Sequence, residues 1–118
     1  MKVTLVPENG KNFIDYEVSG NVISFGDDEI SANLKKKERD EQVKIDVCED
    51  MYGGLTFAPA GARIYVGEIT IPARQYAEEQ VENPNYNPED ENSQEDITER
   101  VPVPFSMDNV ELTLFEIL

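Results

Sequence analysis

The stretch VKIDVCED, residues 43–50, alternates apolar and polar side chains over most of its length. Because successive side chains of a β-strand point to opposite faces, this period of two predicts a strand with one buried face. The glycine pair at residues 53–54 follows, and glycine can adopt the backbone conformation that a hairpin turn needs. The side chains predicted to face inward are Val43, Ile45 and Val47, and those predicted to face outward are Lys44, Asp46 and Cys48.

The same period recurs on either side of this stretch, in segments separated by turn-forming residues. Residues 12–25 predict a β-hairpin, and residues 63–76 predict the longest strand, which Pro72 interrupts. A helix over residues 29–42 is the alternative to a short strand at residues 30–34, but it would carry almost no apolar face. Further short strands are expected at residues 2–6, 55–57 and 109–118.

Together these segments predict a single all-β domain over residues 1–118, with about seven or eight short strands. Its expected architecture is a small antiparallel sandwich or a partly open barrel. The predicted inward-facing side chains are Ile14, Tyr16, Val18, Val43, Ile45, Val47, Ile64, Val66, Leu112 and Leu114.

The sequence VPVPF, residues 101–105, restricts where its strand can lie. Residues two apart in a strand point their N–H groups toward the same edge, so Pro102 and Pro104 remove two donors from one edge only. The strand is therefore expected at a sheet boundary, which it protects against pairing with another chain. Residues 64–76 and 98–105 are predicted to form the arms of one long hairpin. An extended polyproline-like segment is the alternative for residues 101–105.

Between these arms the chain becomes polar and strongly acidic, in the stretch NPNYNPEDENSQED at residues 83–96. Long loops are usually functional or disordered, and like charges and prolines oppose packing onto a core. Residues 78–98 are therefore predicted to be a flexible acidic insert, which either contacts a partner or is only a tolerated, solubilising loop. The candidate partner-contact residues are Tyr86, Glu89, Asp90, Glu91, Glu95 and Asp96.

The whole chain has 25 acidic and 10 basic residues, which gives a formal net charge of −15 at pH 7. Such a charge repels nucleic-acid phosphate and anionic lipid, so neither direct nucleic-acid binding nor membrane adsorption is expected. The first ten residues hold too short an apolar patch for a signal peptide, and no segment reaches the length of a membrane helix. We therefore expect a cytoplasmic location.

The residue types exclude most catalytic and metal chemistry. The chain has no histidine, so no Ser–His or Cys–His pair can form, and its one cysteine, Cys48, lies among carboxylates that raise a thiol's pKa. A single thiol cannot build a cysteine-based zinc site. Residues 90–96 fail the EF-hand pattern, because the sixth position is Glu95 rather than glycine. We predict a non-enzymatic protein with no cofactor and no metal, weak calcium association at residues 90–96 being the alternative.

The two ends of the chain resemble those of small acidic proteins encoded by phages and prophages. The resemblance lies in MKVTLVPENGKNFIDYEVSGNVISFG at residues 1–26 and VPVPFSMDNVELTLFEIL at residues 101–118. Such proteins are often of unassigned function, so the resemblance implies an accessory or virion role, with a virion-associated location as the alternative to the cytoplasm. It assigns no role to any single residue, and the acidic middle section matches least.

Two functions from different classes fit these features. The first is a small interaction or structural module that docks to a protein partner, with assembly of identical copies as one form of it. The second is an inhibitory mimic of nucleic acid, whose carboxylates imitate phosphates and occupy the basic groove of a DNA- or RNA-binding protein. A mimic needs acids spread over one rigid face, whereas much of the charge here lies in one segment. We therefore favour the module.

Overall fold

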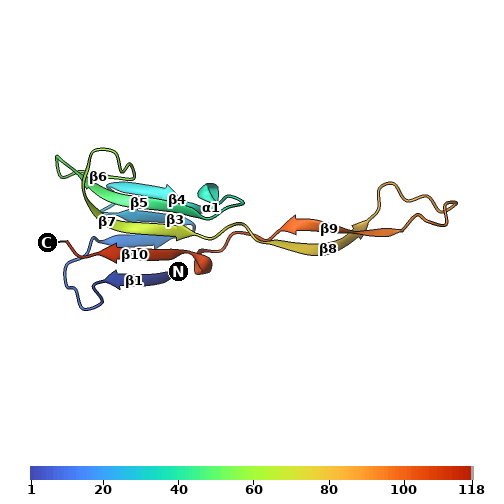
Figure 1. Cartoon of the computed structure of the whole chain (residues 1–118), viewed down its shortest axis with the longest axis horizontal. Coiled ribbons are helices and arrows are strands. Elements are labelled where there is room, and N and C mark those ends of the chain that lie inside the picture. The colour runs from blue at the N-terminus through green and yellow to red at the C-terminus, as the bar shows by residue number, and fades with distance from the viewer. Residues whose placement is uncertain (118) are drawn as a thin grey trace. The chain divides into compact units, whose positions relative to one another are not determined.

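The computed structural model describes residues 1–117 and is built mainly from β-strands, which confirms the predicted all-β class. The chain divides into two compact units (Figure 1): a body, formed by Met1–Ala73 and the chain from Phe105 onward, and a hairpin unit, Arg74–Pro104. The hairpin unit contains β8 (Tyr76–Glu82) and β9 (Asp96–Pro102). The elements of the body are β1 (Lys2–Val6), β2 (Tyr16–Ser19), β3 (Val22–Phe25), β4 (Ile30–Asn33), α1 (Leu34–Lys37), β5 (Val43–Asp50), β6 (Leu55–Thr56), β7 (Ala62–Ile71), the 3-10 helix η1 (Met107–Asn109) and β10 (Glu111–Phe115).

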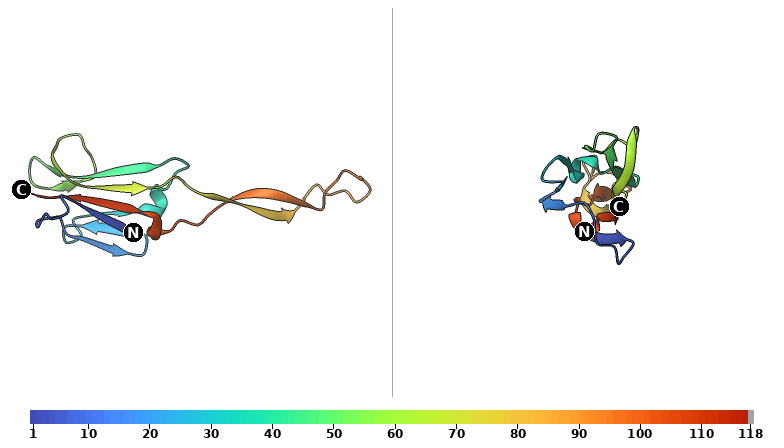
Figure 2. Two further views of the ribbon diagram at one scale, coloured as in Figure 1. Left: turned by 60° about the horizontal axis from the view of Figure 1, so that its bottom comes forward. Right: turned by 90° about the vertical axis from the view of Figure 1, so that its left-hand side faces the viewer.

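The strands of the body form two sheets (Figure 2). One has five strands in the order β1-β10-β7-β5-β6, and the other has three strands in the order β2-β3-β4. Neither sheet closes into a barrel. Side chains from both sheets share one core, so the sheets pack face to face, and of the two predicted architectures the sandwich is the one observed.

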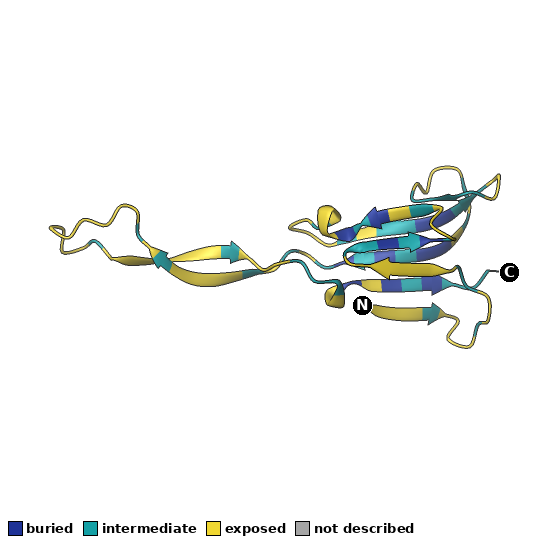
Figure 3. Cartoon of the chain, turned by 180° about the vertical axis from the view of Figure 1, so that it is seen from behind, coloured by how far each residue is buried: buried dark blue, intermediate teal, exposed yellow. Residues whose placement is uncertain are grey.

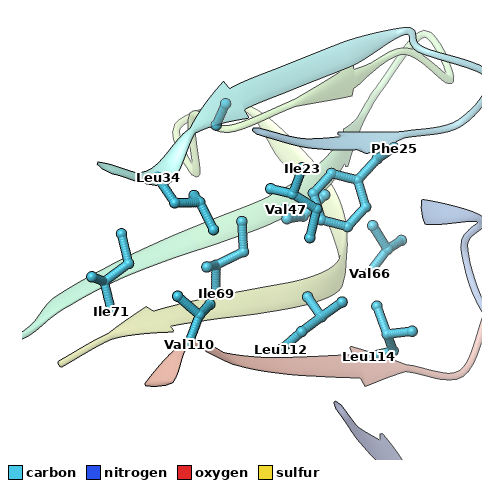
Figure 4. Packing of buried hydrophobic residues seen from close by; sticks show 11 residues of the cluster. Ile23, Phe25, Leu34, Val47, Val66, Ile69, Ile71, Val110, Leu112 and Leu114 are labelled. Carbon is cyan, nitrogen blue, oxygen red and sulfur yellow. The ribbon is translucent and has the colours of Figure 1, made fainter. Parts of the chain in front are cut away.

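The core lies between these two sheets (Figure 4). Ile23 and Phe25 enter it from β3, and Leu34 at the start of α1 is also fully buried. Phe25 packs edge-on against Phe57, with 6.3 Å between the ring centroids. The five-stranded sheet and its flanks contribute Val47, Val66, Ile69, Ile71, Val110, Leu112 and Leu114.

The two ends of the chain meet in the five-stranded sheet, because β1 pairs in parallel with β10. Val3 lies opposite Leu112, and the pairing continues beyond the strands, where the Glu116 N–H donates to the Val6 carbonyl at 2.9 Å. All other paired strands of the body are antiparallel. A parallel pair needs a long connection, and here most of the chain supplies it. The sheet therefore cannot be completed until both ends of the chain are in place.

One of the two β-bulges in β7 explains a change of phase in its sequence. Val47 lies opposite Gly67, but the next residue of β5, Cys48, lies opposite Tyr65, so Val66 is an extra residue in β7. Because of this shift, Ile64 and Val66 before the bulge face the same side as Ile69 after it, although their positions differ in parity. A strict period of two therefore identifies Val66 as inward but misses Ile69 and Ile71.

The predicted inward set is confirmed in part. Val47, Val66, Leu112 and Leu114 are buried in the core. Ile14, Val43, Ile45 and Ile64 are only partly buried and pack against the core from its margin.

The prediction was wrong for Tyr16 and Val18, which are 39% and 40% exposed. Both lie opposite buried residues, Tyr16 opposite Phe25 and Val18 opposite Ile23, so they are on the predicted face. However, β2 is an edge strand of its sheet, all four of its residues are exposed, and the opposing sheet leaves it uncovered.

Three further expectations are corrected. Cys48 was predicted to face outward, yet it is fully buried beside the bulge that disturbs the alternation of β5 and β7. Residues 64–76 and 98–105 do not form one long hairpin, because β7 is built into the five-stranded sheet between β10 and β5. The hairpin is made instead by β8 and β9. The alternative of a helix over residues 29–42 is also wrong, since residues 30–33 form a strand and α1 covers only residues 34–37.

Candidate functional site

The hairpin unit, most of which is exposed (Figure 3), carries all six residues proposed from the sequence as partner contacts. Its strands pair without a register shift over seven positions, from Tyr76 opposite Pro102 to Glu82 opposite Asp96. Residues 78–82 and 96–98, which the sequence placed inside a loop, therefore belong to strands. The insert without secondary structure is confined to residues 83–95.

The two faces of this hairpin differ in composition. Directly opposite residues of paired strands project to the same face, and successive pairs alternate between the faces. One face carries the pairs Ala77–Val101, Glu79–Glu99 and Val81–Ile97, so a pair of acids lies between two apolar pairs. The other face carries Tyr76–Pro102, Glu78–Arg100, Gln80–Thr98 and Glu82–Asp96.

Two of these cross-strand pairs join residues of like charge. Glu79 lies opposite Glu99, and Glu82 lies opposite Asp96. Like charges that face each other directly across a sheet destabilise it, in contrast to the usual stabilising contribution of opposite pairs. The one basic residue within the strands, Arg100, has its guanidinium carbon 3.9 Å from the centroid of the Tyr76 ring, an arrangement that supports a cation–π contact. This contact of Arg100 therefore stabilises one end of the hairpin, and it does not offset the repulsion within the like-charge pairs.

The apolar residues of the hairpin have little cover. Ile97 is 37% exposed, Ala77 is also exposed, and Val81 and Val101 are only half-buried. An isolated two-stranded hairpin is marginally stable at best, because it has no second layer to bury its apolar face. The face with the two apolar pairs is thus a surface that gains stability from any layer that covers it.

Residues 83–95 are organised by hydrogen bonds from short polar side chains. The Asn83 side chain accepts from the Asn85 N–H at 2.9 Å and donates to the Gln94 carbonyl at 2.8 Å. The Asn87 N–H donates to the Ser93 hydroxyl at 2.9 Å, and the Asp90 carboxylate accepts from the Asn92 N–H at 2.9 Å. Asparagine and aspartate favour such turns because their side chains reach their own backbone two residues ahead. The sequence prediction that this segment is mobile remains a prediction.

The proposed contact residues all lie on this exposed part of the hairpin unit. Tyr86 is 41% exposed and follows a turn in which its N–H donates to the Asn83 carbonyl at 3.1 Å. Glu89, Asp90, Glu91 and Glu95 are exposed in the same loop, and Asp96 begins β9. Sequence reasoning missed Glu79, Glu99, Val81 and Ile97, which the strand pairing brings together. YAEEQVE and DITERVP do not alternate apolar and polar residues, and their one signal is a spacing of four, from Ala77 to Val81 and from Ile97 to Val101, which places each apolar pair on one face of a strand.

The body offers little reactive chemistry at its one thiol. Burial raises the pKa of Cys48, and the neighbouring Asp46 carboxylate raises it further. The predicted direction is confirmed, but burial rather than neighbouring charge is the larger cause. Within residues 1–117, no three side chains of the metal-binding types are grouped closely enough to hold an ion.

A shallow hollow of about 330 Å³ in the body is lined by lysine, aspartate and apolar side chains. Its charged lining residues are Lys37, Lys44 and Asp46. Lys44 also forms an ion pair with Glu68 at 3.8 Å; the lysine is exposed and the glutamate half-buried, and a pair so open to solvent contributes little to stability. None of the helices in the part of the chain that the structure describes has the length and apolarity needed to cross a bilayer.

Comparison with protein-family models, with curated proteins and with solved structures found no match for this chain.

Proposed function

We propose that this protein is a small non-enzymatic interaction module that binds a protein partner through its hairpin unit. The observation that carries the proposal is the pairing of Glu79 with Glu99 between the apolar pairs Ala77–Val101 and Val81–Ile97. A face with apolar ends and an acidic centre is suited to a partner that offers apolar side chains around a cation. Resemblance of the chain ends to phage and prophage proteins supports an accessory or virion role, in the cytoplasm of the host or in the particle.

The charge of the hairpin unit specifies the kind of partner. Nine acidic and two basic residues lie between Arg74 and Pro104, so the formal net charge is 2 − 9 = −7. The remaining 16 acids and eight bases give the larger body a net charge of −8. Complementary charge increases the rate of encounter and disfavours acidic competitors. The partner is therefore a protein with a basic surface.

The energetic argument follows from the like-charge pairs. Each cross-strand pair changes the stability of a sheet by roughly 0.2–1 kcal/mol, and pairs of like charge destabilise it. A partner cation placed between Glu79 and Glu99 would convert this repulsion into attraction. Covering the exposed apolar pairs adds about 25 cal/mol for each Å² of apolar surface removed from water. Both gains arise only in the complex.

The distribution of the acids favours a module over a nucleic-acid mimic. Glu79 and Glu99 project from one face of the hairpin, whereas Glu78, Glu82 and Asp96 project from the other. A mimic of phosphates needs a regular row of charges on one face. The acids of the hairpin are divided between two faces instead. This division suits a partner protein that contacts the two faces, or one face and an edge, with different groups.

A pull-down from the native host, run at low and at moderate salt, tests the proposal. The bait is the full chain, compared with a Glu79→Gln/Glu99→Gln variant and with a Glu8→Gln/Glu17→Gln variant of equal net charge. Glu8 and Glu17 are exposed in the body, so their substitution controls for total charge. We expect the same partner to be recovered by the parent and by the body variant, and to be lost with the hairpin variant.

Equal recovery by all three baits would contradict docking through the hairpin face. Recovery of DNA- or RNA-binding proteins that added duplex DNA displaces, with equal loss for both variants, would instead favour the mimic.

A further inference from the structure

The hydrogen bonds at the two ends of the hairpin determine which backbone groups point outward. At one end the Val103 N–H donates to the Gln75 carbonyl at 2.8 Å, and at the other the Asn83 N–H donates to the Glu95 carbonyl at 2.8 Å. N–H groups of a strand alternate between its two edges. With an unbroken register between these bonds, the odd-numbered residues of β8 and β9 direct their N–H groups into the hairpin. The even-numbered residues direct theirs to the outer edges.

The two outer edges differ because of the prolines. On β9 the outward positions include Pro102, followed beyond the strand by Pro104, and neither has an N–H to donate. On β8 the outward positions include Glu78, Gln80 and Glu82, and each has a backbone donor and a carbonyl. One edge is therefore partly closed to strand pairing, as the sequence predicted for residues 101–105, whereas the other is open.

The open edge is accessible and has no neighbour within its sheet. This sheet contains only β8 and β9, so among the described residues no further strand pairs with β8. The side chains of Ala77, Glu78, Glu79 and Gln80 are exposed. An exposed edge strand with intact donors is a template for a strand from another chain.

We propose that the outer edge of β8 binds an extended segment of the partner as a third strand. This inference rests on the proposed function and specifies how the hairpin unit makes its contact. The added strand would extend the face that carries Ala77, Glu79 and Val81. It would also satisfy the outward backbone groups of Glu78, Gln80 and Glu82. Backbone hydrogen bonds would fix the direction of the partner segment along β8, and side chains on the two faces would select its sequence.

The side chains of β8 define the segment that fits. Positions opposite Ala77 and Val81 favour apolar residues, whereas positions opposite Glu78, Glu79 and Glu82 favour lysine or arginine. The occupant is therefore a basic segment with interspersed apolar residues, belonging to a different protein. A second copy of this chain is a poor occupant, because each copy has a net charge of −15 and two copies repel each other.

The test uses a blocked, fluorescent peptide containing Lys-Val-Thr-Lys-Lys-Val, the antiparallel complement of residues 77–82. Its binding to the full chain is measured by fluorescence anisotropy at moderate salt. Two variants are compared with the parent, Gln80→Pro on the open edge and Thr98→Pro on the opposite edge. Gln80 and Thr98 are cross-strand partners with outward N–H groups, so neither substitution removes a hydrogen bond within the hairpin.

We expect Gln80→Pro to weaken peptide binding by at least about tenfold, because it removes a donor and places a ring against the incoming strand. We expect Thr98→Pro to bind within about twofold of the parent. Amide exchange of Glu78, Gln80 and Glu82 in the parent should slow when the peptide is added. A peptide that is N-methylated on the pairing edge should not bind the parent, which tests the inference independently of the folding of any variant.

The remaining outcomes overturn the inference in distinguishable ways. If the peptide does not bind the parent, or if both proline variants bind as well as the parent, β8 does not accept a third strand. Peptide binding that survives both proline substitutions but is lost in Glu79→Gln/Glu99→Gln would support docking on the hairpin face. It would contradict only the addition of a third strand at the edge of β8. Association of the chain with itself that Gln80→Pro abolishes would assign the edge to a second copy instead.

Discussion

Val47 and Gly67 lie directly opposite each other in the β5–β7 pair, at the point where the first bulge begins. A Cβ atom built on Gly67 would lie 3.6 Å from the Val47 Cβ, 3.4 Å from the Leu114 Cδ2 and only 3.2 Å from the Thr113 carbonyl oxygen. The Thr113 oxygen belongs to β10, the neighbouring strand of the same sheet. A side chain at this position would therefore meet a backbone oxygen of β10 and side chains of β5 and β10, so the position suits glycine.

Substitution of this glycine tests the packing at the bulge. We expect Gly67→Ala to reduce the free energy of unfolding by about 1–3 kcal/mol, because a backbone oxygen within a sheet cannot easily move away. Urea denaturation followed by circular dichroism would measure the change. Glu68→Ala on the same strand is the control and should change stability by less than about 1 kcal/mol, since its ion pair is partly exposed to solvent. Equal stability of Gly67→Ala and the parent would contradict the close approach.

The core of the body can be tested at a pair of residues with unequal burial. Leu112 is fully buried opposite Ile69, whereas Ile45 packs at the margin of the core. We expect Leu112→Ala to cost about 2–5 kcal/mol and Ile45→Ala to cost less, because a more exposed site leaves a smaller cavity. Lys44→Ala, which removes an exposed side chain beside Ile45, should have little effect. If both core variants melted with the parent, the sandwich core would be wrong.

Much of the fold follows from the period-two pattern, as the buried positions of Val47, Leu112 and Leu114 show. The pattern fails where burial depends on distant elements. Val18 lies on the predicted face but stays exposed, because the opposing sheet leaves β2 uncovered. The sequence of β2 itself contains no sign of this missing cover. Ile69 was missed because a bulge changes the parity of β7, and a bulge leaves no clear mark in its own strand.

The candidate site was predicted in part for a similar reason. The composition of residues 83–96 identifies an acidic segment, and Pro102 indicates which edge of β9 lacks donors. Composition alone does not place Glu79 opposite Glu99, because that contact depends on the register of two strands that are separated by the loop. Charge clusters are therefore visible in the sequence, whereas the face that they form is visible only once the strands are paired.

Cross-strand position alone predicts that Val18 and Ile23 are equivalent, but their burial predicts that they are not. We expect Ile23→Ala to destabilise the body by about 2–5 kcal/mol and Val18→Ala to destabilise it by less than about 1 kcal/mol. Thermal unfolding of the two variants measures the difference. Similar losses would show that β2 is covered in solution, for example by another molecule, and dilution would then lower the melting temperature.

The thiol of Cys48 provides a pH-dependent test of burial. Because burial raises its pKa, the folded chain keeps this proton at pH values where the unfolded chain has lost it. The contribution of the protonated thiol to the free energy of unfolding is fully present below the ordinary thiol pKa of about 8.5. It is lost as the pH rises through the pKa of Cys48 in the folded chain. We expect the free energy of unfolding of the parent to fall more steeply above about pH 8.5 than that of a Cys48→Ser variant. A thiol reagent should react with the folded chain only slowly, and rapid reaction would contradict burial.

The loop between β8 and β9 is expected to contribute little to the stability of the body. Residues 83–95 are exposed or half-buried, and the hydrogen bonds described above connect them with one another. Their like charges repel, and closing a shorter loop costs less entropy. Replacing residues 84–94 with an Asn-Gly turn, so that the hydrogen-bonded pair Asn83–Glu95 closes it, should therefore leave the melting temperature of the body unchanged and the pairing of Val81 with Ile97 intact. Calorimetry and amide exchange at Val81 and Ile97 would test both parts. A melting temperature lowered by many degrees would show that the acidic loop is packed structure, and its charges would then have to be neutralised by a bound cation or a partner chain.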